Sequence, residues 1–142
     1  MAQPDYIKFL RKYQIRPAVV DGVVLRSGKI LLVKRRKDPE FGKWAVPGGF
    51  VNWGETCEQA VVREVREETN LKVKPVRLLG VYSSQKRDPL RGTIAVAFVC
   101  KYLSGTPRGG DDAELARWWD LGKLPALAFD HAKIIKDALT KS

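Results

Sequence analysis

Short hydrophobic runs alternate with amphipathic segments along this chain. Runs rich in valine, isoleucine and leucine predict β-strands. They cover residues 16–26, 29–35, 44–46, 73–83, 93–102 and 114–119. Helical periodicity predicts three helices, over residues 4–13, 56–69 and 130–139. Strand clusters on both sides of one central helix indicate an α+β sandwich, built as a single domain of residues 1–142 with residues 1–14 as an N-terminal extension.

Turn residues and apolar side chains refine this outline. Ser27-Gly28 joins the first two strands as a hairpin signal. Pro47-Gly48-Gly49 is expected to stop the third strand and to let a ligand come close to the backbone. The first helix is expected to make its apolar contacts through Tyr6, Phe9 and Leu10.

The central helix has clear start and stop signals. Thr56 with Gln59 three residues later forms a capping-box pattern, so the helix is expected to begin at Thr56. It is expected to run to Thr69, because Asn70 can take the left-handed position that follows many helices. At about 100° per residue, four small or apolar residues define one face. They are Cys57, Ala60, Val61 and Val65.

Two glutamates lie on an unexpected face of this helix. Glu64 and Glu68 fall in the middle of the apolar face and Glu67 lies at its edge, whereas Glu58 lies on the outside. A solvated helix held by i, i+4 ion pairs would place all its acids opposite the valines. Two like charges one turn apart on the protein-facing side are destabilising unless a cation compensates them. The helical phase therefore favours a metal site at Glu64 and Glu68.

The charge distribution fits a site for a metal and an anionic ligand. The chain has 142 residues and a formal net charge of +10, yet residues 48–71 contain five glutamates and only two arginines. Carboxylates hold hard cations, and basic surroundings attract a polyphosphate. Nucleic-acid binding is the rival explanation of the positive charge. However, the densest basic run is only Lys34–Lys37 and no zinc-finger, basic-zipper or RNP-type signature is present, so we expect no dedicated nucleic-acid partner.

Composition also bears on other classes of protein. No apolar run reaches the roughly 18 residues needed to cross a membrane, and the N-terminal segment lacks the apolar stretch of a secretory signal. We therefore expect a cytoplasmic protein with no membrane partner. Cys57 and Cys100 are too few for a disulfide framework or a cysteine metal cluster, and both are interpreted as core residues. His131 is the only histidine, and its place after Asp130 predicts a capping or surface role.

The acidic segment resembles a known motif. Gly49 is followed after five residues by Glu55 and after seven more by Arg63-Glu64-Val65-Arg66-Glu67-Glu68-Thr69-Asn70-Leu71. This spacing closely resembles the Nudix box, G-x5-E-x7-R-E-U-x-E-E-x-G-U, in which U is apolar. The one departure is Asn70, where the family has glycine, and asparagine tolerates a positive φ better than other non-glycine residues. The flanking sequence WAVPGG at residues 44–49 and the chain length agree as well.

The resemblance implies a fold and a reaction. Nudix hydrolases have an α/β/α sandwich with a mixed sheet and a central catalytic loop and helix. With Mg²⁺ or Mn²⁺ and water they cleave a nucleoside diphosphate linked to another moiety, the cations neutralising the pyrophosphate and activating the water. A homodimer is the implied assembly.

The resemblance also assigns roles to particular residues. The implied metal ligands are the Gly48 carbonyl and the carboxylates of Glu64, Glu67 and Glu68. Glu67 and Glu68 are implied to be catalytic as well, and Gly49, Glu55 and Arg63 to be structural, with Arg63 and Glu55 pairing to fix the loop against the helix. Many members place the general base in a loop after the box. The candidates here are Asp111, Asp112 and Glu114, of which Glu114 is preferred.

The substrate is suggested by a second segment. Residues 78–92 (LLGVYSSQKRDPLRG) look like those of compact microbial ADP-ribose pyrophosphatases, and the AFDH segment at 128–131 recurs there too. Hydrolysis of ADP-ribose to AMP and ribose 5-phosphate is therefore the first expectation. Arg87 and Arg91 would bind phosphate, and Phe50 and Trp53 would stack on adenine. The alternatives are a pyrophosphatase for nucleoside triphosphates or 8-oxo-dGTP and, more remotely, a non-catalytic nucleotide sensor.

Overall fold

The computed structural model describes residues 5–107 and 115–141, which form one mixed β-sheet with helices on both of its faces. The elements follow one another as α1 (Asp5–Tyr13), β1 (Ala18–Arg26), β2 (Lys29–Lys34), β3 (Trp44–Ala45), β4 (Gly48–Phe50), α2 (Cys57–Thr69), β5 (Lys72–Tyr82), the 3₁₀ helix η1 (Gln85–Arg87), β6 (Ile94–Ser104), β7 (Ala116–Asp120) and α3 (His131–Thr140). Within these residues, no helix is both long and apolar enough to cross a membrane.

The sheet is organised around β1. Its main order is β3-β2-β1-β6-β5, with β4 paired to β1 and β7 paired to β2. The strands β1 and β6 run parallel, whereas β1 pairs antiparallel with both β2 and β4. The predicted hairpin between the first two strands is present, since Arg26 pairs with Lys29. The sheet is therefore mixed, and β1 is the strand from which the loop at Gly48 is positioned.

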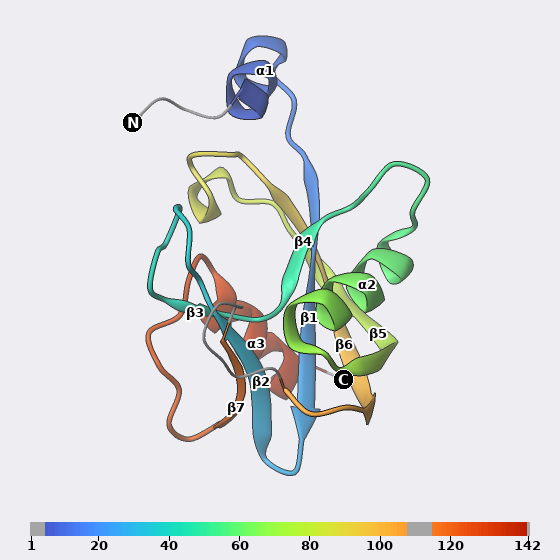
Figure 1. The fold of residues 1–142 in the computed structure, drawn as a ribbon. Coiled ribbons are helices and arrows are strands. Elements are labelled where there is room, and N and C mark those ends of the chain that lie inside the picture. The colour runs from blue at the N-terminus through green and yellow to red at the C-terminus, as the bar shows by residue number, and fades with distance from the viewer. Residues whose placement is uncertain (1–4, 108–114, 142) are drawn as a thin grey trace.

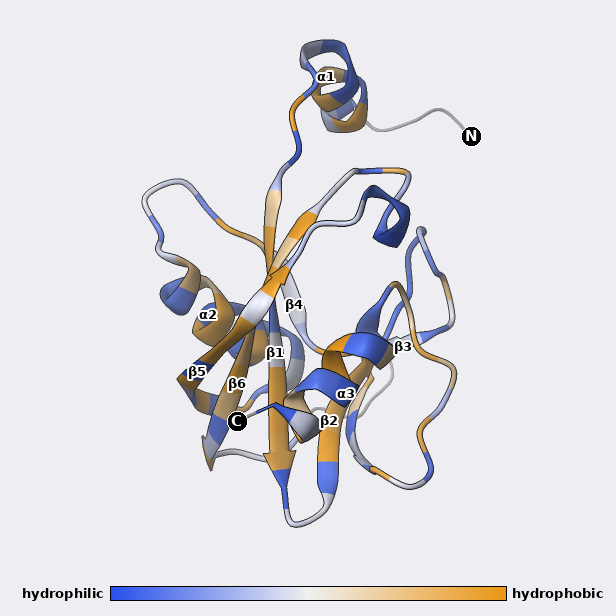
Figure 2. Ribbon diagram, turned by 180° about the vertical axis from the view of Figure 1, so that it is seen from behind, coloured by the Kyte–Doolittle hydropathy of each residue, from blue (hydrophilic) through white to orange (hydrophobic). Residues whose placement is uncertain are grey.

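The two faces of the sheet carry separate hydrophobic cores. Successive side chains of a strand point to opposite faces, so Val19 and Val23 of β1 belong to the core with α3, and Val20 and Val24 to the core with α2. Figure 1 shows α2 in front of the sheet, and the reverse view in Figure 2 shows α3 across its other face. The predicted α+β sandwich with a mixed sheet is confirmed.

Two local expectations need correction. Pro47-Gly48-Gly49 does not simply end a strand, because β4 begins at Gly48 and pairs with Val19–Asp21 of β1. The first helix is present, but its buried residue is Ile7, while Tyr6 and Phe9 are exposed. In Figure 1 this helix stands apart from the sheet at the N-terminal end. It reaches the domain through an edge-to-face contact of Tyr6 with Phe50, whose ring centroids are 6.0 Å apart.

Candidate functional site

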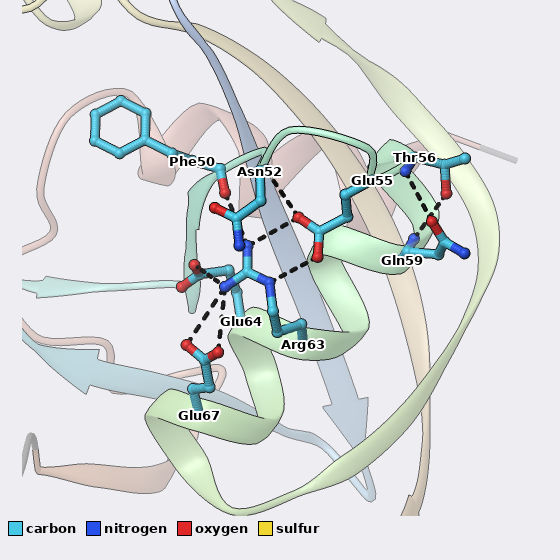
Figure 3. A network of polar contacts seen from close by, with 8 residues as sticks. All are labelled: Phe50, Asn52, Glu55, Thr56, Gln59, Arg63, Glu64 and Glu67. Atoms are coloured by element: carbon cyan, nitrogen blue, oxygen red, sulfur yellow. Dashed lines mark hydrogen bonds and ion pairs between the residues drawn. The ribbon is translucent and has the colours of Figure 1, made fainter.

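The helix α2 is fixed at both ends by the signals in its sequence. The Thr56 hydroxyl accepts a hydrogen bond from the Gln59 backbone N–H at 3.1 Å, and the Gln59 side chain accepts one from the Thr56 N–H at 2.9 Å (Figure 3). The predicted capping box is therefore confirmed. Asn70 adopts a left-handed conformation with φ of 68°, and its N–H donates to the Arg66 carbonyl. Asn70, which stands where the motif has glycine, therefore adopts the left-handed conformation that glycine would adopt there.

The carboxylates of α2 lie as the helical phase predicts. The Glu64 side chain is only 15% exposed and Glu68 is partly buried, whereas the Glu67 side chain is 58% exposed at the edge of the same face. The Gly48 N–H donates a hydrogen bond of 2.7 Å to Glu68 Oε1, so the loop and the helix meet directly. Glu58 points outward into solvent, as expected.

Two adjacent glycines make this close approach possible. A Cβ at Gly49 would lie 2.5 Å from the Glu64 carboxyl carbon, and a Cβ at Gly48 would overlap the Val20 carbonyl oxygen. Neither glycine has a positive φ, so both are required for space rather than for backbone conformation. The Gly48-Gly49 backbone thereby rests directly on the inward-facing carboxylates.

Arg63 ties the loop and the helix together. Its guanidinium donates to both oxygens of Glu55, at 2.7 and 3.0 Å, and to the Phe50 carbonyl at 2.9 Å. It also donates to Glu64 at 2.7 Å and reaches Glu67 at 3.3 Å (Figure 3). The hydrogen bond from Arg63, together with one from the Asn52 N–H, lowers the pKa of Glu55, and the Glu55 contact is the main cause of the raised pKa of Arg63. The geometry matches the structural pairing expected for Arg63 and Glu55.

A cavity of about 130 Å³ opens beside the junction of loop and helix. Carboxylates, basic groups and two phenylalanine rings line it. Its lining includes Asp21, Lys34, Arg35, Arg36, Lys37, Gly48, Gly49, Phe50, Glu68, Arg87, Arg91, Thr93, Phe129 and His131. Three of the four predicted substrate-binding residues, Phe50, Arg87 and Arg91, are brought together here. The fourth, Trp53, lies in the loop before α2 with its side chain fully exposed and does not line the cavity.

The two arginines of the cavity are held by neighbouring side chains. Arg87 is buried, and it donates to both oxygens of Asp130 at 3.1 Å and to the Thr93 hydroxyl at 2.6 Å. Arg91 donates to Asp88 at 2.9 Å. Because their partners fix both guanidinium groups, the positive charge at the cavity wall has a defined position.

Among the cavity residues that were not identified from the sequence as functional, two are both buried and ionisable. Asp21 lies in the middle of β1 and is 5% exposed, and His131 opens α3 and is 3% exposed. The prediction of a capping or surface role for His131 is wrong. Its Nδ1 accepts the Val46 N–H at 3.1 Å inside the fold, and Asp130 makes no side-chain cap to α3. The available signal was Asp21 itself, an acid that interrupts the apolar row formed by Val19 and Val23.

The acidic residues present suit a hard divalent cation by the chemistry of their donors. Glu64, Glu67 and Glu68 supply carboxylate oxygens from one helix, and the Gly48-Gly49 backbone is packed against two of them. In this structure the carboxylates bind Arg63 and the Gly48 N–H, and residues 5–107 and 115–141 contain no preassembled group of three acidic, histidine or cysteine ligands. Asp111, Asp112 and Glu114, the predicted candidates for the general base, lie outside the described residues.

Comparison with known proteins agrees with this geometry. The family model of the NUDIX domain matches residues 15–138. Over 131 residues the chain is 53% identical to the ADP-ribose pyrophosphatase of Methanocaldococcus jannaschii, a match that covers 90% of this chain and 78% of that protein. Further curated relatives are longer, and the chain spans 60% or less of their length.

Two solved structures are also similar to this chain in fold. The NUDIX domain of Shewanella oneidensis NrtR, complexed with ADP-ribose, superposes with a TM-score of 0.77 at 25% identity, covering 98% of this chain and 97% of that one. A bifunctional NMN adenylyltransferase/ADP-ribose pyrophosphatase from Francisella tularensis, complexed with AMP and a manganese ion, superposes with a TM-score of 0.74 at 26% identity. That match covers 95% of this chain and 46% of the longer protein.

Proposed function

This chain belongs to the Nudix hydrolase family, and on that premise we propose that it hydrolyses ADP-ribose to AMP and ribose 5-phosphate. Water adds across the pyrophosphate bond: its oxygen bonds to one phosphorus, and the bridging oxygen leaves with the other phosphate. The 53% identity to an ADP-ribose pyrophosphatase supports this choice of substrate. The same domain architecture in a structure complexed with ADP-ribose supports it as well.

The observation that carries the proposal is the meeting of an acidic helix and a basic cavity at one loop. Gly48 and Glu68 are joined by a hydrogen bond of 2.7 Å, and both line the cavity that Arg87 and Arg91 also line. A diphosphate placed there would have carboxylates able to hold a cation on one side and fixed guanidinium groups on the other. Arginine suits bidentate contacts to phosphate oxygens.

We propose Mg²⁺, or alternatively Mn²⁺, as the cation. Glu64, Glu67, Glu68 and the Gly48 carbonyl would hold it, and when bound it would neutralise the pyrophosphate and lower the pKa of the attacking water. Glu67 and Glu68 are the proposed catalytic carboxylates on α2, and Glu114 is the proposed general base. Arg63 keeps Glu64 and the loop in place through its contacts with Glu55 and the Phe50 carbonyl.

The substrate contacts divide between the cavity and its surroundings. Arg87 and Arg91 would bind phosphate oxygens, and Phe50 would contribute an aromatic face. Trp53 is exposed in the loop before α2, so it would contact adenine only where the base extends out of the cavity. Nucleoside triphosphates, including 8-oxo-dGTP, are the second candidate class, because the same carboxylates and arginines would serve them.

A substrate panel with Mg²⁺ decides between these classes. Values of kcat/KM would be measured for ADP-ribose, for the common nucleoside triphosphates and for 8-oxo-dGTP, with the products separated by chromatography. We expect ADP-ribose to be preferred and the products to be AMP and ribose 5-phosphate. A preference of tenfold or more for any triphosphate would overturn the proposal. A protein that binds ADP-ribose tightly in the presence of Mg²⁺ and never hydrolyses it would instead be a sensor.

We also propose that the single domain acts as a homodimer in the cytoplasm. Exposed apolar side chains on the edge strand β5, among them Val76, Leu78 and Val81, are compatible with a self-association surface. Sedimentation equilibrium would test the assembly, with a constant monomer mass up to high protein concentration as the contrary result. Cell fractionation would test the compartment.

A further inference from the structure

Asp21 is a buried acid of the cavity that the proposed reaction leaves without a role. It occupies a core-facing position of β1 between Val19 and Val23, and its Cα pairs with Gly48 at the start of β4. Its side chain is 7% exposed, and the residue lines the cavity together with Phe50 and Glu68. A carboxylate placed in an apolar row loses hydration, and this cost must be offset by hydrogen bonds.

Asp21 lacks that compensation at one of its oxygens. Among the described residues, Oδ2 is buried and has no hydrogen-bond partner. Arg87 Nη2 lies 3.7 Å and His131 Nε2 lies 3.5 Å from it, and both distances are too long for a good hydrogen bond. A buried acceptor left in this state destabilises the fold, and such groups are rare in folded proteins.

Both neighbouring groups are also engaged by other partners. The Val46 N–H donates to His131 Nδ1 at 3.1 Å, so the ring hydrogen is on Nε2 and faces Asp21. Arg87 is engaged by Asp130 and by the Thr93 hydroxyl. The charge of Arg87 and the ring N–H of His131 orient the Asp21 carboxylate electrostatically. Its Oδ2 can still accept a hydrogen bond from a donor group on a ligand.

The size of the cavity indicates which part of a substrate carries that donor. A cavity of about 150 Å³ accommodates one benzene ring, and the cavity here measures about 130 Å³. Its volume is therefore close to that of one monocyclic group, such as a ribose. The rings of Phe50 and Phe129 in its lining offer apolar faces to such a ring, and Asp21 offers the acceptor for its hydroxyls.

We propose that Asp21 is the specificity-determining residue that accepts hydrogen bonds from the hydroxyls of the distal ribose, the sugar beyond the diphosphate. His131 and Arg87 are positioning residues that hold its carboxylate. The inference rests on the proposed function, since it concerns the sugar of the same substrate. The Asp21 carboxylate would make the protein prefer nucleoside diphosphates esterified to a hydroxylated sugar over those esterified to an apolar group of similar size.

The test compares two substrates that differ only in the hydroxyls. One is ADP-ribose, and the other is ADP esterified to tetrahydrofurfuryl alcohol, which keeps the five-membered ring and its CH₂–O–P link but lacks the three ring hydroxyls. Both compete in one reaction with the wild type and with Asp21→Asn. The competition ratio does not depend on the fraction of folded enzyme, so a loss of stability in the variant does not obscure it.

We expect the wild type to prefer ADP-ribose and Asp21→Asn to reduce that preference about tenfold or more, the scale of a lost hydrogen bond to a charged group. Asp137→Asn is the matched control, because Asp137 is also buried but binds Tyr82 and does not line the cavity, and it should leave the ratio unchanged. An unchanged ratio in Asp21→Asn would overturn the inference and leave Asp21 as a structural or water-binding group.

Binding of the product separates this inference from the proposed function. Calorimetry would compare ribose 5-phosphate with tetrahydrofurfuryl phosphate, for the wild type and for Asp21→Asn. Tighter binding of ribose 5-phosphate that is lost in the variant supports the role of Asp21 even if ADP-ribose is not hydrolysed. Equal binding of both compounds to the wild type contradicts it even if ADP-ribose proves to be the substrate.

Discussion

The backbone N–H of Gly48 donates a hydrogen bond of 2.7 Å to Glu68 Oε1, joining the start of β4 to the last turn of α2 across 20 residues of sequence. The carboxylate is thereby held at the junction from which both the acidic helix and the cavity extend. A cation bound by Glu68 would lie next to the Gly48 backbone without any large movement of the main chain.

Replacing Glu68 with glutamine is expected to separate fold from activity. The amide oxygen can still accept the Gly48 N–H, so the melting temperature should change little, but the charge available to a cation is lost. We expect kcat for ADP-ribose to fall about a hundredfold or more, the scale for removing one electrostatic group at a reacting centre. Glu58→Gln is the matched control, because Glu58 lies on the exposed face of the same helix. Retained activity in Glu68→Gln would remove Glu68 from the metal site.

Metal binding is expected to appear as thermal stabilisation. A ligand that binds only the folded state raises its stability by about 2.7 kcal/mol at a hundredfold excess over Kd. Adding Mg²⁺ or Mn²⁺ to the protein treated with chelator should therefore raise the melting temperature of the wild type and restore activity. The double variant Glu64→Gln with Glu68→Gln should show neither effect. An equal thermal shift in the double variant would place the cation elsewhere.

Arg63 is expected to stabilise the loop before α2. Its side chain is only 24% exposed and holds Glu55, Glu64 and the Phe50 carbonyl. Arg63→Ala leaves these acceptors without their donor, so we expect a loss of about 2 kcal/mol in the free energy of unfolding, measured by urea denaturation. Arg63→Lys should recover only part of it, because lysine cannot form the bidentate contact. The control is Arg66→Ala on the exposed side of the helix, which should cost less than about 0.5 kcal/mol.

Asn70 stands where the family motif has glycine, and we expect the two residues to give similar stability at this position. Asn70 has φ of 68°, a region that glycine enters freely and that costs most other residues about 1–2 kcal/mol. Asn70→Gly should therefore leave the melting temperature and kcat nearly unchanged, whereas Asn70→Ala should lower stability by about 1 kcal/mol. Equal effects of the two substitutions would show that the asparagine side chain, which donates to the Thr106 carbonyl, is what matters.

The contact between Tyr82 and Asp137 is expected to give stability at both ends of the pH range. Burial and this 2.8 Å hydrogen bond raise the pKa of Tyr82, and the same bond lowers the pKa of Asp137. The Asp137 contribution is present above its usual pKa of 3.8 and is lost as pH falls through the lower value of the folded state. The Tyr82 contribution is present below its usual pKa of 10.0 and is lost as pH rises through the higher value.

Tyr82→Phe should therefore lower the melting temperature near neutral pH and flatten its dependence on pH in both directions. Melting temperatures from pH 3 to 11 would measure this. Tyr102→Phe is the control, since the Tyr102 hydroxyl donates to the exposed Gly105 carbonyl and not to a carboxylate. A Tyr82→Phe profile parallel to that of the wild type would show that the two groups are not coupled.

Features encoded by neighbouring residues could be predicted from the sequence. The capping box of Thr56 and Gln59, the left-handed Asn70 and the inward phase of Glu64 and Glu68 all follow from spacing within one helix. The strands of the sheet other than β4 were located to within a few residues by their apolar runs. The motif of residues 49–71 was sufficient to identify the family.

Features that depend on distant partners could not be predicted in the same way. A single acid in an apolar strand and a single histidine after a predicted turn have no local pattern, and so the burial of Asp21 and His131 was missed. Tyr6 and Phe9 have a helical spacing, but Ile7 is the buried residue of α1. Phe50 and Trp53 both lie within the motif of residues 49–71, yet of these two only Phe50 lines the cavity.

The hydrogen bond between Val46 and His131 spans 85 residues of sequence, and it has a consequence for how the molecule comes to be active. Closing a contact of such long separation costs loop entropy, which slows the folding of a domain that depends on it. Because His131 at the start of α3 lines the cavity, we expect ligand binding to require that α3 is docked on the sheet. Loosening of this helix would then weaken binding while leaving the carboxylates of α2 in place.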